Sequence, residues 1–198
     1  MTDLEQKHNG LRQDCWNESL QSFGKAYIFD KRAQRYSFYI NLLKVFGIVV
    51  PVSVGATAIG YGFESVLLKY SIALAVPLTI AQLIFSVFAI VYKWDDELGY
   101  SYEASQELST LSDKFKRLAK TPPDDIKVFE HEFEILNTII KTRNQQSSKH
   151  NLREWELRMG MRYSLREYQR KCAGCGEIPK SMEPTKCDVC GNFNKSKV

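Results

Sequence analysis

Two long stretches without a formal charge dominate the pattern of apolar and polar positions, and only six residues separate them. They are Val45–Phe63, with 19 residues, and Tyr70–Tyr92, with 23. At about 1.5 Å per residue, helices of these lengths reach roughly 28 and 34 Å, enough to cross a hydrocarbon core about 30 Å thick. The alternative is that both stretches are buried core helices of a soluble protein. This interpretation is the weaker of the two, because so short a chain has little room to bury two such helices. The pattern therefore predicts a transmembrane hairpin over residues 45–92.

The residues around the two stretches predict how the hairpin is oriented. Aromatic side chains lie where a membrane–water interface would be, namely Tyr61, Phe63, Tyr70, Tyr92 and Trp94. Five cations precede the first stretch within residues 25–44: Lys25, Lys31, Arg32, Arg35 and Lys44. The connecting residues 64–69 hold only Lys69. Because positive residues favour the cytoplasmic side, we expect both termini in the cytoplasm.

Both predicted spans carry small and polar residues that a plain anchor does not need. Ala56 and Gly60 have the small-xxx-small spacing that lets helices approach closely, and Ser71 and Ala75 repeat it. The candidates for pore lining or helix packing are Ser53, Thr57, Thr79, Gln82 and Ser86. Hydrogen bonding between the two helices is one interpretation, because unpaired polar groups are costly in lipid. A polar passage is the other, and it requires a homo-oligomer because one hairpin cannot enclose a pore.

Helical periodicity continues on both sides of the hairpin. Before it, one aromatic face recurs at spacings of 4, 3 and 4: Trp16, Leu20, Phe23 and Tyr27. After it, one apolar seam comprises Ala104, Leu108, Leu111, Phe115 and Leu118, and a second comprises Ile126, Phe129, Phe133, Leu136 and Ile140. Pro122 and Pro123 end the first of these helices, and Asp124 or Asp125 can cap the next. We therefore expect an antiparallel helical hairpin after the membrane.

A third helix, expected over residues 152–171, has a basic stripe at i+4 spacing: Arg158, Arg162, Arg166 and Arg170. A solvated helix face is one interpretation, supported by the i+4 pair Glu154 and Arg158. The functional alternatives are contact with anionic lipid, with an acidic partner surface or with nucleic-acid phosphates. Nucleic acid ranks last among them, and the net charge of +4 does not by itself suggest it. Arginines at this spacing could also hold a charged nucleotide, although the sequence shows no ligand cradle.

The candidate chemistry lies in the last part of the chain, where two CxxC pairs are separated by eleven residues. Their members are Cys172, Cys175, Cys187 and Cys190. Two such turns can supply four thiolates to one tetrahedral Zn²⁺, and a site closed by four protein ligands is structural. The nearby Gly174, Gly176 and Gly191 are expected to give these turns backbone freedom. Cys15 stands alone and is expected to be a buried or interfacial thiol.

No catalytic constellation accompanies these features. The sequence contains no glycine-rich phosphate loop, no HExxH and no GxSxG motif, and its three histidines are scattered. We therefore expect a protein that is not an enzyme. The predicted fold class is an all-α membrane protein with four parts: an N-terminal amphipathic helix (1–44), a two-helix transmembrane hairpin (45–92), a cytosolic helical hairpin plus basic helix (93–171) and a small zinc ribbon (172–198).

The cysteine spacing, from Cys172 to Cys190, resembles that of the bacterial mobilome CxxCx(11)CxxC proteins. The helix, two-span hairpin and cytosolic helices before it are similar to SLATT-type two-transmembrane domains. The resemblance covers nearly the whole chain, and only the four cysteines map position by position. It implies a multi-pass protein of the bacterial inner membrane that belongs to an anti-phage or mobile-element conflict system. Such a protein would disrupt the membrane when a sensor or signalling protein encoded nearby, or a nucleotide signal, triggers it.

Two functions follow from these observations. The first is an oligomeric effector that forms a pore or breaches the inner membrane. The second is a membrane-tethered adaptor that recruits a cytosolic partner through the basic helix and the zinc ribbon. The trigger, the number of copies and the ion selectivity are not specified by the residues themselves.

Overall fold

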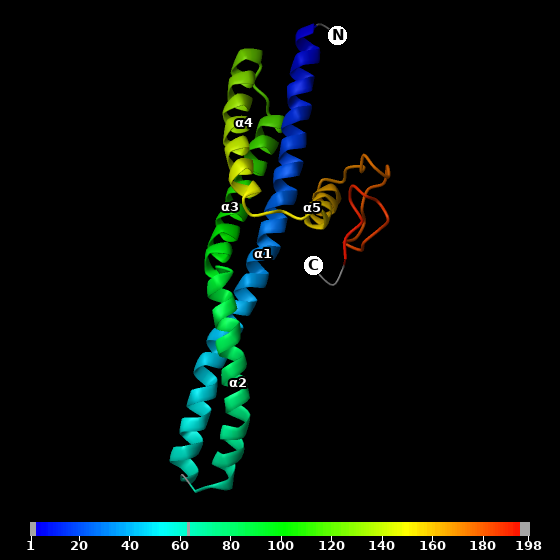
Figure 1. Cartoon of the computed structure of the whole chain (residues 1–198). Coiled ribbons are helices and arrows are strands. Elements are labelled where there is room, and N and C mark those ends of the chain that lie inside the picture. The colour runs from blue at the N-terminus through cyan, green and yellow to red at the C-terminus, as the bar shows by residue number, and fades with distance from the viewer. Residues whose placement is uncertain (1–2, 63, 195–198) are drawn as a thin grey trace. The chain divides into compact units, whose positions relative to one another are not determined.

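The computed structural model describes residues 3–62 and 64–194, and in these residues it contains five α-helices and no strand (Figure 1). The helices are α1 (Asp3–Tyr61), α2 (Val66–Val91), α3 (Trp94–Lys120), α4 (Ile126–Ser148) and α5 (Glu154–Glu167). A non-helical segment follows α5 and carries the four paired cysteines. The predicted all-α fold with a terminal cysteine cluster is confirmed. Phe63, one of the expected interfacial aromatic residues, lies outside the described residues.

Contacts divide the chain into two compact units, which we call the cysteine unit and the apolar unit. The cysteine unit comprises the residues up to Lys31 and those from Ser101 onward, and the apolar unit comprises Arg32–Tyr100. Helices α1 and α3 therefore contribute residues to both units. The boundaries predicted after residues 44, 92 and 171 follow changes of motif along the chain, and they stay predictions.

Helix α1 continues without a break from the predicted amphipathic segment into the first apolar stretch. Residues 28–46 contain neither glycine nor proline, so no residue there interrupts the backbone hydrogen bonding of the helix. Pro51 lies inside the helix. It lacks one backbone N–H, a loss that neighbouring groups can offset in an apolar helix.

The core of the cysteine unit uses both predicted seams. All five α3 seam residues are buried, and on α4 Phe129 and Ile140 are buried while the other three are half-buried. Phe115 of α3 meets Phe133 of α4 edge to face, with ring centroids 6.1 Å apart. The Asp125 side chain caps α4 by accepting a hydrogen bond from the Lys127 backbone N–H at 2.9 Å. The predicted helical hairpin is thus present, with α3 and α4 side by side in Figure 1.

Helices α1 and α5 approach one another closely at two glycines. A Cβ atom on Gly24 would lie 2.8 Å from the carbonyl oxygen of Gly160, and a Cβ on Gly160 would lie 2.6 Å from that of Gly24. Beside this crossing, Tyr27 stacks on Tyr163 with centroids 3.9 Å apart, and Phe23 stacks on the same ring at 5.4 Å. The aromatic face predicted on the first helix therefore has α5 as its partner.

In the apolar unit, Gln82 of α2 reaches the first helix. Its side-chain Nε2 donates to the backbone oxygen of Leu43 at 3.5 Å. A Cβ on Gly47 would lie 2.8 Å from the same Nε2, so the glycine leaves room for this amide. Ser65 caps α2 by accepting from the Leu68 N–H at 3.1 Å. Helix α2 therefore begins at Val66, inside the segment that the sequence predicted to be the connection.

Candidate metal centre

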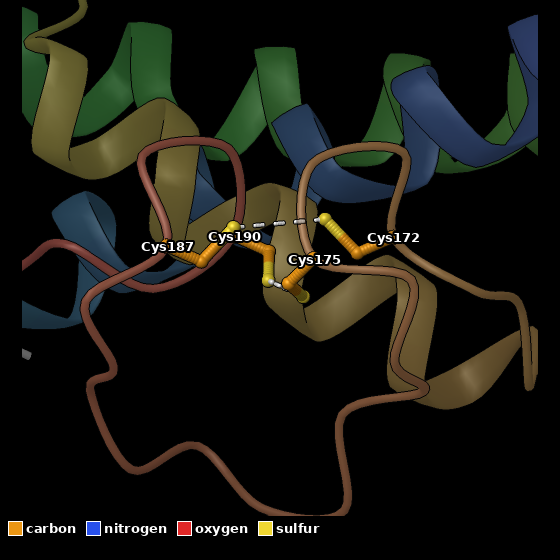
Figure 2. Close-up of side chains that lie close together, drawn as sticks. All are labelled: Cys172, Cys175, Cys187 and Cys190. Atoms are coloured by element: carbon orange, nitrogen blue, oxygen red, sulfur yellow. Dashed lines mark hydrogen bonds between the residues drawn. The ribbon is translucent and has the colours of Figure 1, made fainter.

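The two cysteine pairs sit on two turns of matching hydrogen-bond pattern. The carbonyl oxygen of Cys172 accepts from the N–H of Gly176 at 2.8 Å, and that of Cys187 accepts from the N–H of Gly191 at 2.8 Å. Each turn points its two side chains toward the other turn (Figure 2). The repeated pattern explains why two short pairs, eleven residues apart in sequence, present four sulfur atoms to one point.

The distances between the sulfur atoms fit one tetrahedral metal ion. Sγ of Cys172 lies 3.9 Å from Sγ of Cys187, Sγ of Cys175 lies 3.9 Å from Sγ of Cys190, and all four lie within 4.8 Å of one another. A tetrahedral ion with metal–sulfur bonds of about 2.3 Å places its ligand atoms about 3.8 Å apart. The four cysteines can therefore hold a metal, and they fill all four positions around it.

The three glycines near the cysteines serve two different purposes. Gly176 has φ +72°, a left-handed backbone that favours glycine. The other two are required by space instead: a Cβ on Gly174 would lie 2.7 Å from Cγ2 of Val189, and one on Gly191 would overlap Oγ1 of Thr185. The expectation that all three glycines provide backbone freedom is therefore right only for Gly176.

Burial and backbone hydrogen bonds make the four thiols unequal. Cys172 and Cys190 are buried, whereas Cys175 is exposed. The backbone N–H groups of Cys190 and Val189 lower the pKa of Cys187 to about 7. Burial raises the pKa of Cys190. Because a thiol binds metal as its thiolate, the two backbone N–H groups favour the form of Cys187 that acts as a ligand.

The cysteine segment packs on helices α1 and α5. Cys172 and Cys190 share a cluster with Leu20 of α1 and Leu165 of α5. In a second cluster, Phe193, which follows the last cysteine, packs with Ile28 of α1 and Met159 of α5. Apolar side chains of two helices therefore supply the core that so short a segment cannot build alone.

The basic stripe predicted on the third helix is divided by the structure. Arg158 pairs with Glu154 at 3.0 Å, as expected, and Arg166 pairs with Glu167 at 2.6 Å. Arg170 lies beyond the end of α5, and its NH1 donates to Oδ1 of Asn17 at 3.1 Å. The stripe that the sequence placed along residues 152–171 is shorter, since α5 ends at Glu167.

Arg162, the remaining member, is buried against the cysteine segment, with 6% of its surface exposed. Its Nε donates to the backbone oxygen of Ser181 at 2.7 Å, and its NH1 to that of Cys190 at 3.5 Å. The same NH1 lies 4.0 Å from Sγ of Cys190. Sequence reasoning missed this role, although Met159 and Leu165 lie three residues before and after Arg162 and mark the buried face of the helix.

The polar candidates of the apolar unit are partly brought together. Gln82 bonds across to α1, as described above, whereas two hydroxyls bond within their own helix: Thr57 donates to the Ser53 oxygen at 2.7 Å, and Thr79 donates to that of Ala75. Ser86 is half-buried. A Cβ on Gly60 would meet no atom within 4 Å, so this small residue is not used for packing within one chain.

Cys15 is fully buried in the cysteine unit, in agreement with the expectation of a buried thiol. Burial raises its pKa to about 12. A thiol with so high a pKa stays protonated at neutral pH, so Cys15 behaves as a small apolar side chain rather than as a further metal ligand.

Comparison with known proteins gives one match. A family model described as "Mobilome CxxCx(11)CxxC protein" matches residues 12–193. The match includes α2, α3, α4, α5, most of α1 and all four paired cysteines. The comparisons with curated proteins and with solved structures found no match.

Proposed function

Since the chain belongs to the family of mobilome CxxCx(11)CxxC proteins, we propose that it is a membrane effector of a bacterial anti-phage or mobile-element conflict system. On activation, several copies assemble through the two apolar helices and form a pore or disrupt the inner membrane. The protein has no enzymatic activity of its own. A sensor or signalling protein encoded nearby supplies the trigger, and nucleic acid is not its ligand.

The observation that carries the proposal is the exposure of the apolar unit. No residue in the most apolar 18-residue window of α1 or α2 is buried. Ile59 and Ile90, for example, are 88% and 76% exposed. A soluble protein would hide such side chains, because burying one stabilises the fold by about 1.5–3 kcal/mol. A lipid bilayer offers these residues the apolar surroundings that the chain itself does not provide.

Assembly of several copies follows from the topology of the hairpin. Two helices cannot enclose a passage, so a pore requires hairpins from more than one chain. Gly60, with open space around its Cβ position, supports this step because small residues let helices from separate chains approach closely. Thr79 and Ser86, which make no bond across to α1 among the described contacts, are the side chains proposed to line the passage.

The metal is proposed to be Zn²⁺ in a structural role. Four cysteine thiolates are typical of a closed zinc site that stabilises a fold and leaves no position for a substrate. Free thiols of this kind persist in a reducing compartment. This fits the proposed topology, in which both termini lie in the cytoplasm and α1 and α2 cross the inner membrane.

Membrane potential tests the effector proposal. Cells that express the wild type with its native neighbours, challenged with phage, are compared with cells that express the triple variant Thr79→Leu, Gln82→Leu, Ser86→Leu at matched protein level. We expect depolarisation with the wild type and none with the variant. A control substitution, Ile80→Leu on the same helix, should depolarise as the wild type does. An intact potential with the wild type under phage challenge would contradict the proposal.

A membrane-tethered adaptor is the second candidate. It is favoured by three exposed cations around the cysteines: Lys171, Lys180 and Lys186. An adaptor would tolerate the triple leucine variant, and it would lose its cytosolic partner in a pull-down when Arg158 and these lysines are replaced by glutamine. An effector shows the opposite pattern, so the same set of variants separates the two functions.

A further inference from the structure

Arg162 brings a positive charge to the cysteine cluster from a helix outside it. The residue belongs to α5, and its guanidinium is buried beside Cys190. A buried cation is rarely stable without a partner of opposite charge or a set of hydrogen bonds. Among the described residues, the partners of Arg162 are the two carbonyl oxygens and the Cys190 sulfur given above, and none of them is a carboxylate.

The metal site supplies the negative charge that this cation lacks. Four thiolates around one divalent ion leave a formal charge of two negative units at the centre. Two of the four ligands, Cys172 and Cys190, are buried. Because water does not reach them freely, it only weakly screens the negative charge on their sulfur atoms. A guanidinium whose NH1 lies 4.0 Å from a ligand sulfur offsets that charge at short range.

The same side chain also fixes the backbone of the second cysteine pair. Ser181, which accepts from Nε at 2.7 Å, lies in the stretch between the two pairs, and Cys190 closes the second pair. Arg162 thus connects α5 with both of these segments. Lysine has one point charge and no planar fork, so it could replace the charge of Arg162 but not this pair of directed contacts.

We propose that Arg162 is a positioning residue of the metal centre, which holds the second cysteine pair in place and offsets the charge of the four metal-bound thiolates. This proposal rests on the proposed zinc site and is independent of any membrane activity. Groups that hydrogen-bond the ligands of a metal commonly change metal affinity by about 10–100-fold when they are removed. Arg162 belongs to that class.

The test measures zinc affinity by competition with a chromophoric chelator, using the full chain purified in detergent. We expect Arg162→Gln to bind zinc at least about 10-fold more weakly than the wild type, and Arg162→Lys to recover part of the loss because it restores the charge. The control is Arg166→Gln, one turn further along α5, which removes the same charge from a residue paired with Glu167 and should stay within twofold of the wild type.

Three results would overturn the proposal. The first is equal zinc affinity in Arg162→Gln and the wild type. The second is a loss in Arg162→Lys as large as in Arg162→Gln together with unchanged helical circular dichroism, which would remove the role of charge. The third is a wild type that binds no zinc, which would contradict the proposed zinc site as well. Either of the first two results would leave the proposed zinc site unaffected. If Arg162→Gln does not fold, the Lys variant alone must show weaker zinc binding than Arg166→Gln.

Discussion

The cysteine unit and the apolar unit are both built from helices, and α1 and α3 contribute to both, but the two units expose their apolar side chains to very different extents. In the cysteine unit, Phe29 and Phe115 are fully buried, whereas in the apolar unit Ile59 is 88% exposed. Helices α3 and α4 of the first unit have one apolar seam and polar residues elsewhere, whereas the second unit holds two long stretches without a formal charge, Val45–Phe63 and Tyr70–Tyr92. The comparison teaches that the first unit buries its apolar side chains within the chain itself, whereas the second leaves them exposed, as the proposed membrane location requires.

The largest expected effect is the loss of one metal ligand in the cysteine unit. Cys172→Ser removes a thiolate from the four-cysteine site, and the segment that depends on the metal should unfold. Zinc bound to the purified protein should fall to near zero, while Cys15→Ser, a change at a cysteine outside the cluster, should keep its full zinc content. A Cys172→Ser protein that retains one zinc per chain would contradict the four-cysteine assignment.

A smaller effect is expected where α1 and α5 meet. Gly160→Ala places a Cβ 2.6 Å from the Gly24 oxygen, so the two helices must separate. Such overpacking should lower the free energy of unfolding by about 1–3 kcal/mol. The control is Gly10→Ala in α1, where a Cβ meets no atom within 4 Å and a helix-favouring alanine should stabilise slightly. Chemical denaturation followed by circular dichroism measures the free energy of unfolding of both variants. Equal values for Gly160→Ala and Gly10→Ala would show that α1 and α5 do not cross closely.

The cap of α4 should have an effect of about the same size or less. Asp125→Ala removes the acceptor for the Lys127 N–H and should cost about 1 kcal/mol of unfolding free energy. Asp125→Asn keeps an acceptor oxygen and should behave nearly as the wild type. If both variants lose the same stability, the charge of Asp125 rather than its capping bond is the source of the effect.

The smallest effect is expected in the apolar unit, and it sharpens the comparison. Gln82→Leu removes the bond to the Leu43 oxygen. Hydrogen bonds between helices in a membrane contribute about 0.6 kcal/mol on average, so the loss of unfolding free energy in detergent should be small. Thr79→Val, which removes a bond within one helix, is the matched control. A loss larger than that caused by Gly160→Ala would mean that polar contacts dominate the packing of the apolar unit.

Much of the fold could be predicted because local pattern and burial agree. The α3 seam from Ala104 to Leu118 was predicted residue by residue, since its spacing places all members on one side of the helix. The four cysteines were predicted for a similar reason, because their spacing itself specifies two turns. The start of α2 was predicted less accurately. Residues 64–69 were expected to connect the two spans, but the Ser65 side chain caps a helix that begins at Val66.

Contacts between segments that are distant in the sequence could not be predicted. Arg162 looked like one member of a basic stripe, because a single helix pattern does not say which face meets the cysteine segment more than ten residues later. The role of Gly47 was missed for the same reason, as its neighbour Gln82 lies on the other apolar helix. Such contacts depend on how helices cross, and the period of one helix does not determine that.

Side-dependent thiol labelling tests most directly whether the apolar unit crosses the membrane while the cysteine unit stays in the cytoplasm. Glu64→Cys places a thiol between the two apolar helices, and Gln106→Cys places one on an exposed site of α3. In intact spheroplasts, a membrane-impermeant maleimide should label Glu64→Cys, and it should label Gln106→Cys only after permeabilisation. Protection of Glu64→Cys in intact spheroplasts, or equal labelling of both sites, would contradict the account.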